Sequence, residues 1–241
     1  MEGAIELARA CERDGVHTLA ATPHLRADHP RVRPSELADR CAALSDRLAD
    51  AGVTLRVVAA GEVDALWAQD ASDDDLRLAS YAQRGSDLLL ETPYGPLPEG
   101  FEDLVFRLSL RGFRILIGHP ERNPTFQRDP ERLRGLVERG ALLQVTALSL
   151  VRPDRESRSR RLALWLIGHG LAHVIASDAH SAQWRAPDLS AGVKVAGRFG
   201  RDRARWMVTI APAAILAGEP LPEPPPARQR GGLGGLLRRS C

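Results

Sequence analysis

Six side chains of the kinds that bind metal ions lie at the ends of predicted strands: His24, Glu62, Glu91, His119, Asp178 and His180. Each stands at or just beyond the carboxyl end of a short apolar segment, and in parallel β/α folds these ends meet at one edge of the sheet. Three carboxylates placed together repel one another, and bound cations would relieve that repulsion. Mixed imidazole and carboxylate ligands suit Mn²⁺, Fe²⁺ or Zn²⁺, and this many ligands predicts more than one ion.

Two arginines follow the metal-type motifs and indicate a substrate. Arg122 lies in GHPERN (118–123), and Arg185 lies in SDAHSAQWR (177–185). A guanidinium group matches a phosphate dianion through two parallel charged hydrogen bonds. Divalent ions also lower the pKa of a coordinated water and so supply a nucleophile at neutral pH. The pattern therefore favours hydrolysis of a phosphoester, although arginine is abundant here and a structural role is the competing interpretation.

Other residues that could do chemistry are assigned structural roles. CAALSDR (41–47) matches a Cys-x5-Arg pattern, but it has no glycine and lies in a predicted helix, so we exclude Cys41 as a nucleophile. The remaining histidines have no partner motif and are expected to be structural or solvated. They are His17, His29, His169 and His173.

Short apolar strands alternate with amphipathic helices along the chain. The predicted strands are 16–22, 53–62, 86–91, 113–119, 141–146 and 172–178. The predicted helices are 3–14, 34–52, 99–111, 130–139 and 157–169. This alternation predicts an α/β fold with parallel strands, arranged either as a barrel or as an open doubly wound sheet.

Composition narrows the class of protein. The chain has 241 residues, of which 44% are hydrophobic and 27% charged, which suits a folded domain and excludes a membrane-embedded or disordered one. Thirty-three basic residues against 31 acidic ones disfavour a nucleic-acid partner. The widely spaced Cys11, Cys41 and Cys241 suit a reducing compartment, and acids at Glu2 and Glu6 argue against membrane insertion. A cytoplasmic protein is predicted.

The last part of the chain differs in composition from the rest. Residues 219–241 are rich in proline, glycine and arginine and offer little apolar surface to bury. We therefore expect a catalytic domain over 1–218 and a disordered tail over 219–241.

The motifs together resemble a known family. TPH (22–24), GEV (61–63), LLE (89–91), GHPERN, QVT (144–146) and ASDAH (176–180) have the order and spacing of the bacterial PHP-superfamily tyrosine phosphatases. These CpsB-like enzymes accompany capsule and exopolysaccharide synthesis, and the resemblance covers about residues 3–217. It implies a distorted (β/α)7 TIM-like barrel of the PHP type and a Mn²⁺ site of two to three divalent ions, with Fe²⁺ or Zn²⁺ as alternatives. The implied reaction is attack of a metal-bound hydroxide on phosphotyrosine of a protein.

The resemblance also implies roles for individual residues and a partner. The implied metal ligands are His24, Glu62, Glu91, His119, Asp178 and His180, with Glu62 placed to bridge two ions. Arg122 and Arg185 correspond to a phosphate clamp. The implied partner is a cognate bacterial tyrosine kinase, and a homo-oligomer is left open.

The sequence departs from the family at its beginning. Family members open with a strand that carries a His-x-His pair, and this strand is expected to be missing before Met1. Either the start codon is assigned too late, or the protein is truncated. Two alternatives to a protein-tyrosine phosphatase therefore stay open: a small-molecule phosphomonoesterase such as a histidinol phosphatase, and a non-catalytic remnant.

Overall fold

A computed structural model describes residues 2–151 and 157–227. Its strands are all paired in parallel and form two sheets. The smaller sheet consists of β1 (Thr18–Ala21) and β3 (Arg56–Ala59). The larger sheet consists, in spatial order, of β2 (His24–Leu25), β4 (Glu62–Asp64), β5 (Asp87–Glu91), β6 (Arg114–Ile117), β7 (Leu142–Thr146) and β8 (Val174–Ala176).

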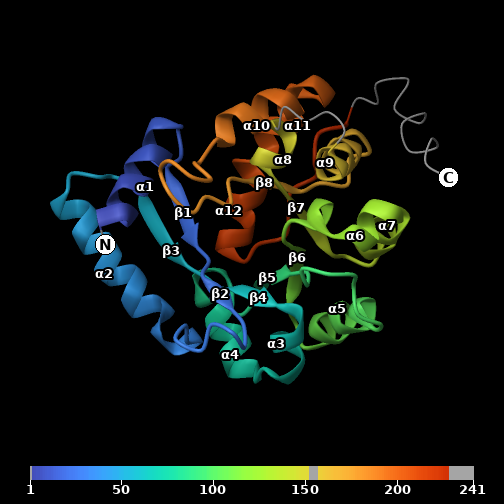
Figure 1. The fold of residues 1–241 in the computed structure, drawn as a ribbon, viewed down its shortest axis with the longest axis horizontal. Coiled ribbons are helices and arrows are strands. Elements are labelled where there is room, and N and C mark those ends of the chain that lie inside the picture. Colours follow the sequence, from blue (N-terminus) through green and yellow to red (C-terminus); the bar gives the residue numbers. More distant parts are fainter. Residues whose placement is uncertain (1, 152–156, 228–241) are drawn as a thin grey trace.

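Helices surround the strands (Figure 1). Those in the first half of the chain are α1 (Glu2–Arg13), α2 (Leu37–Asp50), α3 (Ala65–Asp70), α4 (Asp73–Ala79) and α5 (Phe101–Leu110). Those in the second half are α6 (Pro124–Arg128), α7 (Glu131–Glu138), α8 (Ala147–Val151), α9 (Arg158–Gly168), α10 (Leu189–Ala196), α11 (Arg201–Trp206) and α12 (Ile210–Ala217). Short 3-10 turns stand at 34–36, 81–83, 120–122 and 197–199. Figure 1 shows α1 and α2 beside the smaller sheet and α10 and α11 beside β8.

The two sheets are joined by two bent strands. Ala21 pairs with Ala59 in the smaller sheet, and His24 pairs with Glu62 in the larger one, so the offset between partners is the same on both sides of the bend. The amide of Glu62 donates to the carbonyl of Pro23 (3.0 Å) within the bend itself. The predicted strand 16–22 forms as β1, and the chain continues past Pro23, which has no backbone N–H to donate, as β2. The predicted strand 53–62 is interrupted at residues 60–61, between β3 and β4.

Each of the two sheets packs on its own apolar core. All five residues of β5 and all five of β7 are buried, as expected for strands covered on both faces. Their apolar side chains belong to the main core, which extends to α5, α9 and α12. A second, smaller core under α1 and α2 contains Cys11, Leu48 and Leu55. The smaller sheet thus has its own apolar support on its helical side.

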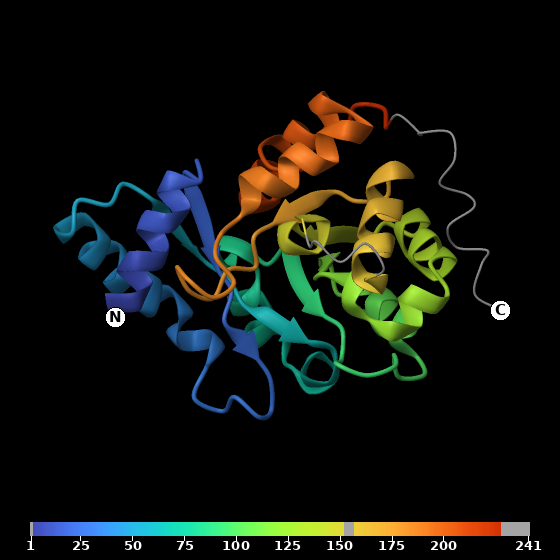
Figure 2. The same cartoon turned by 45° about the horizontal axis from the view of Figure 1, so that its top comes forward.

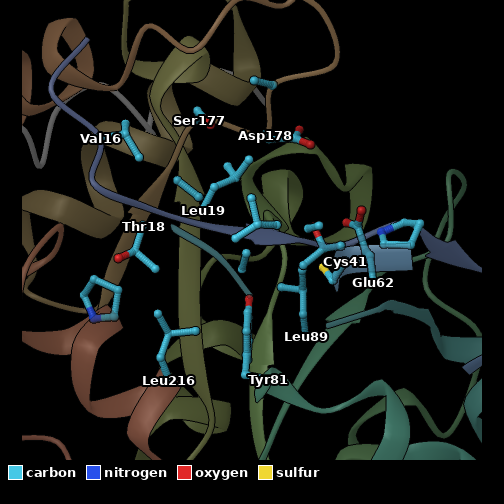
Figure 3. Close-up of a pocket in the computed structure, with 18 of the residues that line it drawn as sticks. Val16, Thr18, Leu19, Cys41, Glu62, Tyr81, Leu89, Ser177, Asp178 and Leu216 are labelled. Atoms are coloured by element: carbon cyan, nitrogen blue, oxygen red, sulfur yellow. The ribbon is translucent and has the colours of Figure 1, made fainter. Parts of the chain in front are cut away.

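The parallel α/β class is confirmed, but a closed barrel is not observed. Among the described residues, β8 forms no ladder with β1 or β2. A cavity of about 730 Å³ lies between them. Figure 3 shows Leu19, Leu89 and Leu216 among the side chains that line it. The edge of β8 contacts the segment between α11 and α12 instead: the amide of Ile175 donates to the carbonyl of Met207 (3.2 Å).

Only part of the predicted tail can be placed. Residues 219–227 have no regular secondary structure, and Arg203 Nη1 donates to the carbonyl of Pro225 (2.9 Å). Residues 228–241 lie outside the described part of the chain, so the boundary at 218 and the disorder of the tail stay predictions. In the described ranges, no helix has the length and hydropathy needed to cross a membrane.

Candidate metal centre

The strand pairing brings the first predicted ligands together. His24 and Glu62 are register partners in β2 and β4, and Glu91 ends the neighbouring strand β5. His24 Nδ1 lies 3.2 Å from Glu91 Oε2 and 3.4 Å from Glu62 Oε2. The three residues offer ligand atoms that all lie within 4.8 Å of one another. They form the first donor set.

A second donor set shares Glu62 with the first. It contains Glu62, His119 and Asp178, whose ligand atoms again lie within 4.8 Å of one another. His119 Nε2 is 2.6 Å from Glu62 Oε1. His119 and Asp178 follow β6 and β8 in loops where both residues have positive φ (60° and 50°), so sharp turns aim their side chains back toward the strand ends. Glu62 is the only residue common to the two sets.

His180 lies at the rim rather than in either donor set. Its Nδ1 is 3.9 Å from Asp178 Oδ1, and its Nε2 is 3.0 Å from Arg185 Nη1. The His24 and His180 rings are 6.5 Å apart between centroids. The structure therefore brings five of the six predicted ligands into two sets and places the sixth beside them.

Both predicted clamp arginines contact the same carboxylate oxygen. Arg122 Nη1 is 2.7 Å from Asp178 Oδ2, and Arg185 Nη2 also donates to that atom. The two guanidinium groups remain partly exposed, whereas Asp178 is mostly covered. Since a carboxylate and a phosphate present similar acceptor oxygens, Asp178 marks a point where the two arginines converge on an anion.

The electrostatics of the cluster favour charged imidazoles. The hydrogen bond with Glu91, assisted by the charge of Glu62, raises the pKa of His24 although burial opposes this. For His119, burial lowers the pKa, but the contact with Glu62 outweighs it and the net direction is upward. Burial alone would raise the pKa of Glu91, and the contact with His24 lowers it instead. The two imidazoles thus occupy positions between carboxylates that favour positive charge, which are the positions that cations would take.

The donor sets fit divalent ions. Glu62 and Glu91 are buried within reach of one another, and such carboxylates need compensating positive charge. The buried His119 Nδ1 has no hydrogen-bond partner among the described residues. Imidazole and carboxylate donors in two sets with a shared carboxylate suit a pair of borderline or hard cations.

The structure also shows residues that the sequence did not single out. Arg26 Nη1 lies 3.4 Å from Glu91 Oε2, and Glu121, on the same loop as His119 and Arg122, has a fully buried side chain. Each stands within three residues of a predicted ligand, which is the signal that could have found them. Cys41 lies on α2, where burial raises the pKa of its thiol, in agreement with its exclusion as a nucleophile.

Comparisons with known proteins identify the family of this chain. The family described as "Capsular polysaccharide synthesis, CpsB/CapC" matches residues 1–217. The chain belongs to the CpsB/CapC family. It is 28% identical to the tyrosine-protein phosphatase YwqE of Bacillus subtilis over 92% of this chain and 87% of YwqE. It is 21% identical to the tyrosine-protein phosphatase CpsB of Streptococcus pneumoniae over 85% of this chain and 86% of CpsB.

A solved structure shares the fold. It comes from work on YwqE of B. subtilis and CpsB of S. pneumoniae, described there as metal-dependent tyrosine phosphatases. The match has a TM-score of 0.79 and 27% sequence identity, and it covers 95% of this chain and 92% of the other. The resemblance drawn from the motifs is thereby confirmed.

Proposed function

We propose that this CpsB/CapC-family protein is a metal-dependent protein-tyrosine phosphatase. The observation that carries the proposal is the pair of donor sets that share Glu62, with two arginines converging beside them on Asp178. The relatives named as tyrosine-protein phosphatases span most of the chain and support the same activity.

The proposed roles follow the two parts of the site. The proposed metal ligands are His24, Glu62, Glu91, His119, Asp178 and His180. Arg122 and Arg185 would bind the phosphate of the substrate and orient it, while the carboxylates stay with the ions. Bound divalent ions would supply an activated water and neutralise charge on the phosphate. During hydrolysis the bond between phosphorus and the tyrosine oxygen breaks, and that oxygen takes up a proton.

We propose Mn²⁺ as the metal, in two to three ions, because the mixed imidazole and carboxylate donors suit it. The substrate protein would be a bacterial tyrosine kinase of capsule or exopolysaccharide synthesis, in the cytoplasm. We also propose a fold related to a closed (β/α)7 barrel, in which one more strand would lie where the cavity between β1 and β8 is found.

The test is phosphate release from a phosphotyrosine peptide by the purified protein with Mn²⁺. Asp178→Asn is expected to lower the rate by roughly 100-fold or more, since a neutral amide replaces an anionic metal ligand and the anionic partner of both arginines. Asp188→Asn, an exposed carboxylate in the following loop, is the matched control and should leave the rate unchanged. Metal content per protein, measured in parallel, should fall only in Asp178→Asn.

Histidinol phosphate in the same assay separates the two enzyme classes. Faster hydrolysis of this small ester than of the peptide would replace the proposed substrate class by small phosphomonoesters. A wild-type protein that binds Mn²⁺ stoichiometrically and hydrolyses neither compound would contradict the proposed activity itself.

A further inference from the structure

Trp184 has a large, exposed side chain next to the proposed phosphate clamp of Arg122 and Arg185. It lies in the loop between β8 and α10, and 68% of its surface is exposed. Figure 2 shows this loop, drawn in orange, running beside β1 and β2. A single exposed aromatic is common on protein surfaces, so its meaning depends on what fixes it and what it faces.

The loop holds Trp184 in a defined turn. Ser181 Oγ accepts a hydrogen bond from the Trp184 amide (2.7 Å) and donates one to the Trp184 carbonyl (2.6 Å). The amide of His180 donates to the carbonyl of Arg185 (3.0 Å), which closes the turn from its other side. The backbone that carries the indole is thus fixed before a ligand binds, and only the side-chain torsions of Trp184 have to be ordered.

The indole also lies next to both parts of the site. Its ring centroid is 6.2 Å from that of His180, in an edge-to-face arrangement. The guanidinium carbon of Arg185 is 5.9 Å from the indole centroid. The same arginine donates to Asp178, where the two clamp residues converge. An anion held by Arg185 would therefore bring its nearest substituent close to the indole.

A second exposed aromatic near the site differs in its surroundings. Tyr94 is 79% exposed, but the guanidinium carbon of Arg26 lies 4.8 Å from the centroid of its ring. Arg26 is in turn held by Asp28 and Glu91. A guanidinium group thus lies closer to the Tyr94 ring than the 5.9 Å between Arg185 and the indole, and it is tied to two carboxylates, so Tyr94 is the less suitable platform for a ligand.

We propose that Trp184 binds the phenyl ring of the substrate and so sets a preference for aryl over alkyl phosphates. The inference rests on the proposed function, because it takes Arg185 as a phosphate ligand. In phosphotyrosine the ring is bonded directly to the ester oxygen, so it follows the phosphate into the site. Aromatic pairs of this kind strengthen binding by roughly threefold to tenfold.

Two phosphonates that cannot be hydrolysed isolate the contribution of the ring. Phenylphosphonate and methylphosphonate share the anionic group and differ in the substituent. In calorimetric titrations of the Mn²⁺-loaded protein, phenylphosphonate is expected to bind roughly threefold to tenfold more tightly. Trp184→Ala should remove this preference through weaker binding of phenylphosphonate alone, and Trp184→Phe should keep most of it. Phe106→Ala, an exposed aromatic on the outer helix α5, should keep all of it.

Kinetics give a second readout that a merely structural residue would not produce. With a phosphotyrosine peptide, Trp184→Ala should raise KM several-fold and leave kcat close to the wild-type value, because the lost contact is made equally before and during the reaction.

Three results would overturn the assignment to Trp184: an unchanged phenyl preference in Trp184→Ala, loss of the preference in Tyr94→Ala only, or equal binding of the two phosphonates by the wild type. In each of these cases the wild-type protein could still release phosphate from the peptide. Absence of that release would instead count against the proposed function.

Discussion

At the scale of single residues, Glu121 fixes the loop that carries two site residues. Its side chain is fully buried, and Oε1 accepts hydrogen bonds from the Thr146 amide (3.1 Å) and from Ser149 Oγ (2.8 Å). Its backbone carbonyl accepts a further bond from Gln127 Nε2 (2.8 Å). These contacts tie the turn after β6 to the end of β7. Because His119 and Arg122 stand on either side of Glu121, their positions depend on it.

Removing these acceptors should destabilise the protein. We expect Glu121→Ala to lower the free energy of unfolding by about 2–4 kcal/mol, since two buried donors lose their partner. Glu121→Gln keeps an acceptor oxygen in the same place and should cost less than half as much. Urea denaturation followed by circular dichroism measures both, with the exposed Glu131→Gln on α7 as control. Equal losses for the two Glu121 variants would show that the charge, and not the acceptor geometry, matters.

At the scale of elements, His173 closes the start of the β7–β8 ladder. Its imidazole Nδ1 accepts from the Leu143 amide (3.2 Å), and its own amide donates to the Leu143 carbonyl (2.9 Å). Burial and the charge of Arg203 lower the pKa of His173 from 6.5 to about 4. The neutral ring is therefore part of the sheet, because a protonated Nδ1 could no longer accept.

This geometry makes the sheet sensitive to acid. Between pH 6.5 and about 4 the unfolded chain binds a proton at His173 that the folded protein does not, so stability is complete above pH 6.5 and falls as the pH decreases. The loss should reach up to about 3 kcal/mol near pH 4. His173→Asn keeps an acceptor that does not titrate, so its stability deficit relative to the wild type, measured by urea denaturation, should shrink from pH 7 to pH 4.5. A deficit independent of pH would contradict the assignment.

The elements that the sequence predicted are those with a strong local signal. The segments DLLLE and LLQVT became β5 and β7, because strands that are covered on both faces consist mainly of apolar residues. The helices 99–111, 130–139 and 157–169 also formed, within a few residues of their predicted ends. The continuation of strand 16–22 as β2 and the break in strand 53–62 were not predicted, since Pro23 and Gly61 gave only local hints of a bend that depends on neighbouring strands.

In the candidate site, too, some features could be predicted from the sequence and others depend on contacts between distant segments. Strand ends fix where His24, Glu62, Glu91, His119 and Asp178 stand, so their convergence could be predicted from the order of strands. The sharing of Asp178 by Arg122 and Arg185 could not, because it depends on two loops whose backbone adopts positive φ at His119, Asp178 and Arg185. The contact of Arg26 with Glu91 likewise joins residues far apart in the sequence, and Trp184 lies in the same loop as Arg185.

At the scale of the whole molecule, the smaller sheet must be held against the larger one across the cavity. The bent strands join the two sheets on one side. On the other side, Asp14 at the end of α1 reaches the first turn of α10, where its Oδ2 accepts from the amides of Leu189 (2.7 Å) and Ser190 (3.1 Å). The Ser190 hydroxyl donates to its other oxygen. Asp14 thus caps a helix that lies 175 residues further along the chain.

Loss of this cap should loosen the smaller sheet against α10. We expect Asp14→Ala to lower the free energy of unfolding by about 1 kcal/mol, the usual cost of a lost helix cap, and Asp14→Asn to cost less because an amide oxygen still accepts. Amide hydrogen exchange gives the local readout: Leu189 and Ser190 should exchange faster in Asp14→Ala, and so should the amides of α1 and β1. The exposed Asp46→Ala on α2 should change none of them. Faster exchange in α10 alone would mean that Asp14 serves only its helix, and that the bent strands by themselves hold the two sheets together.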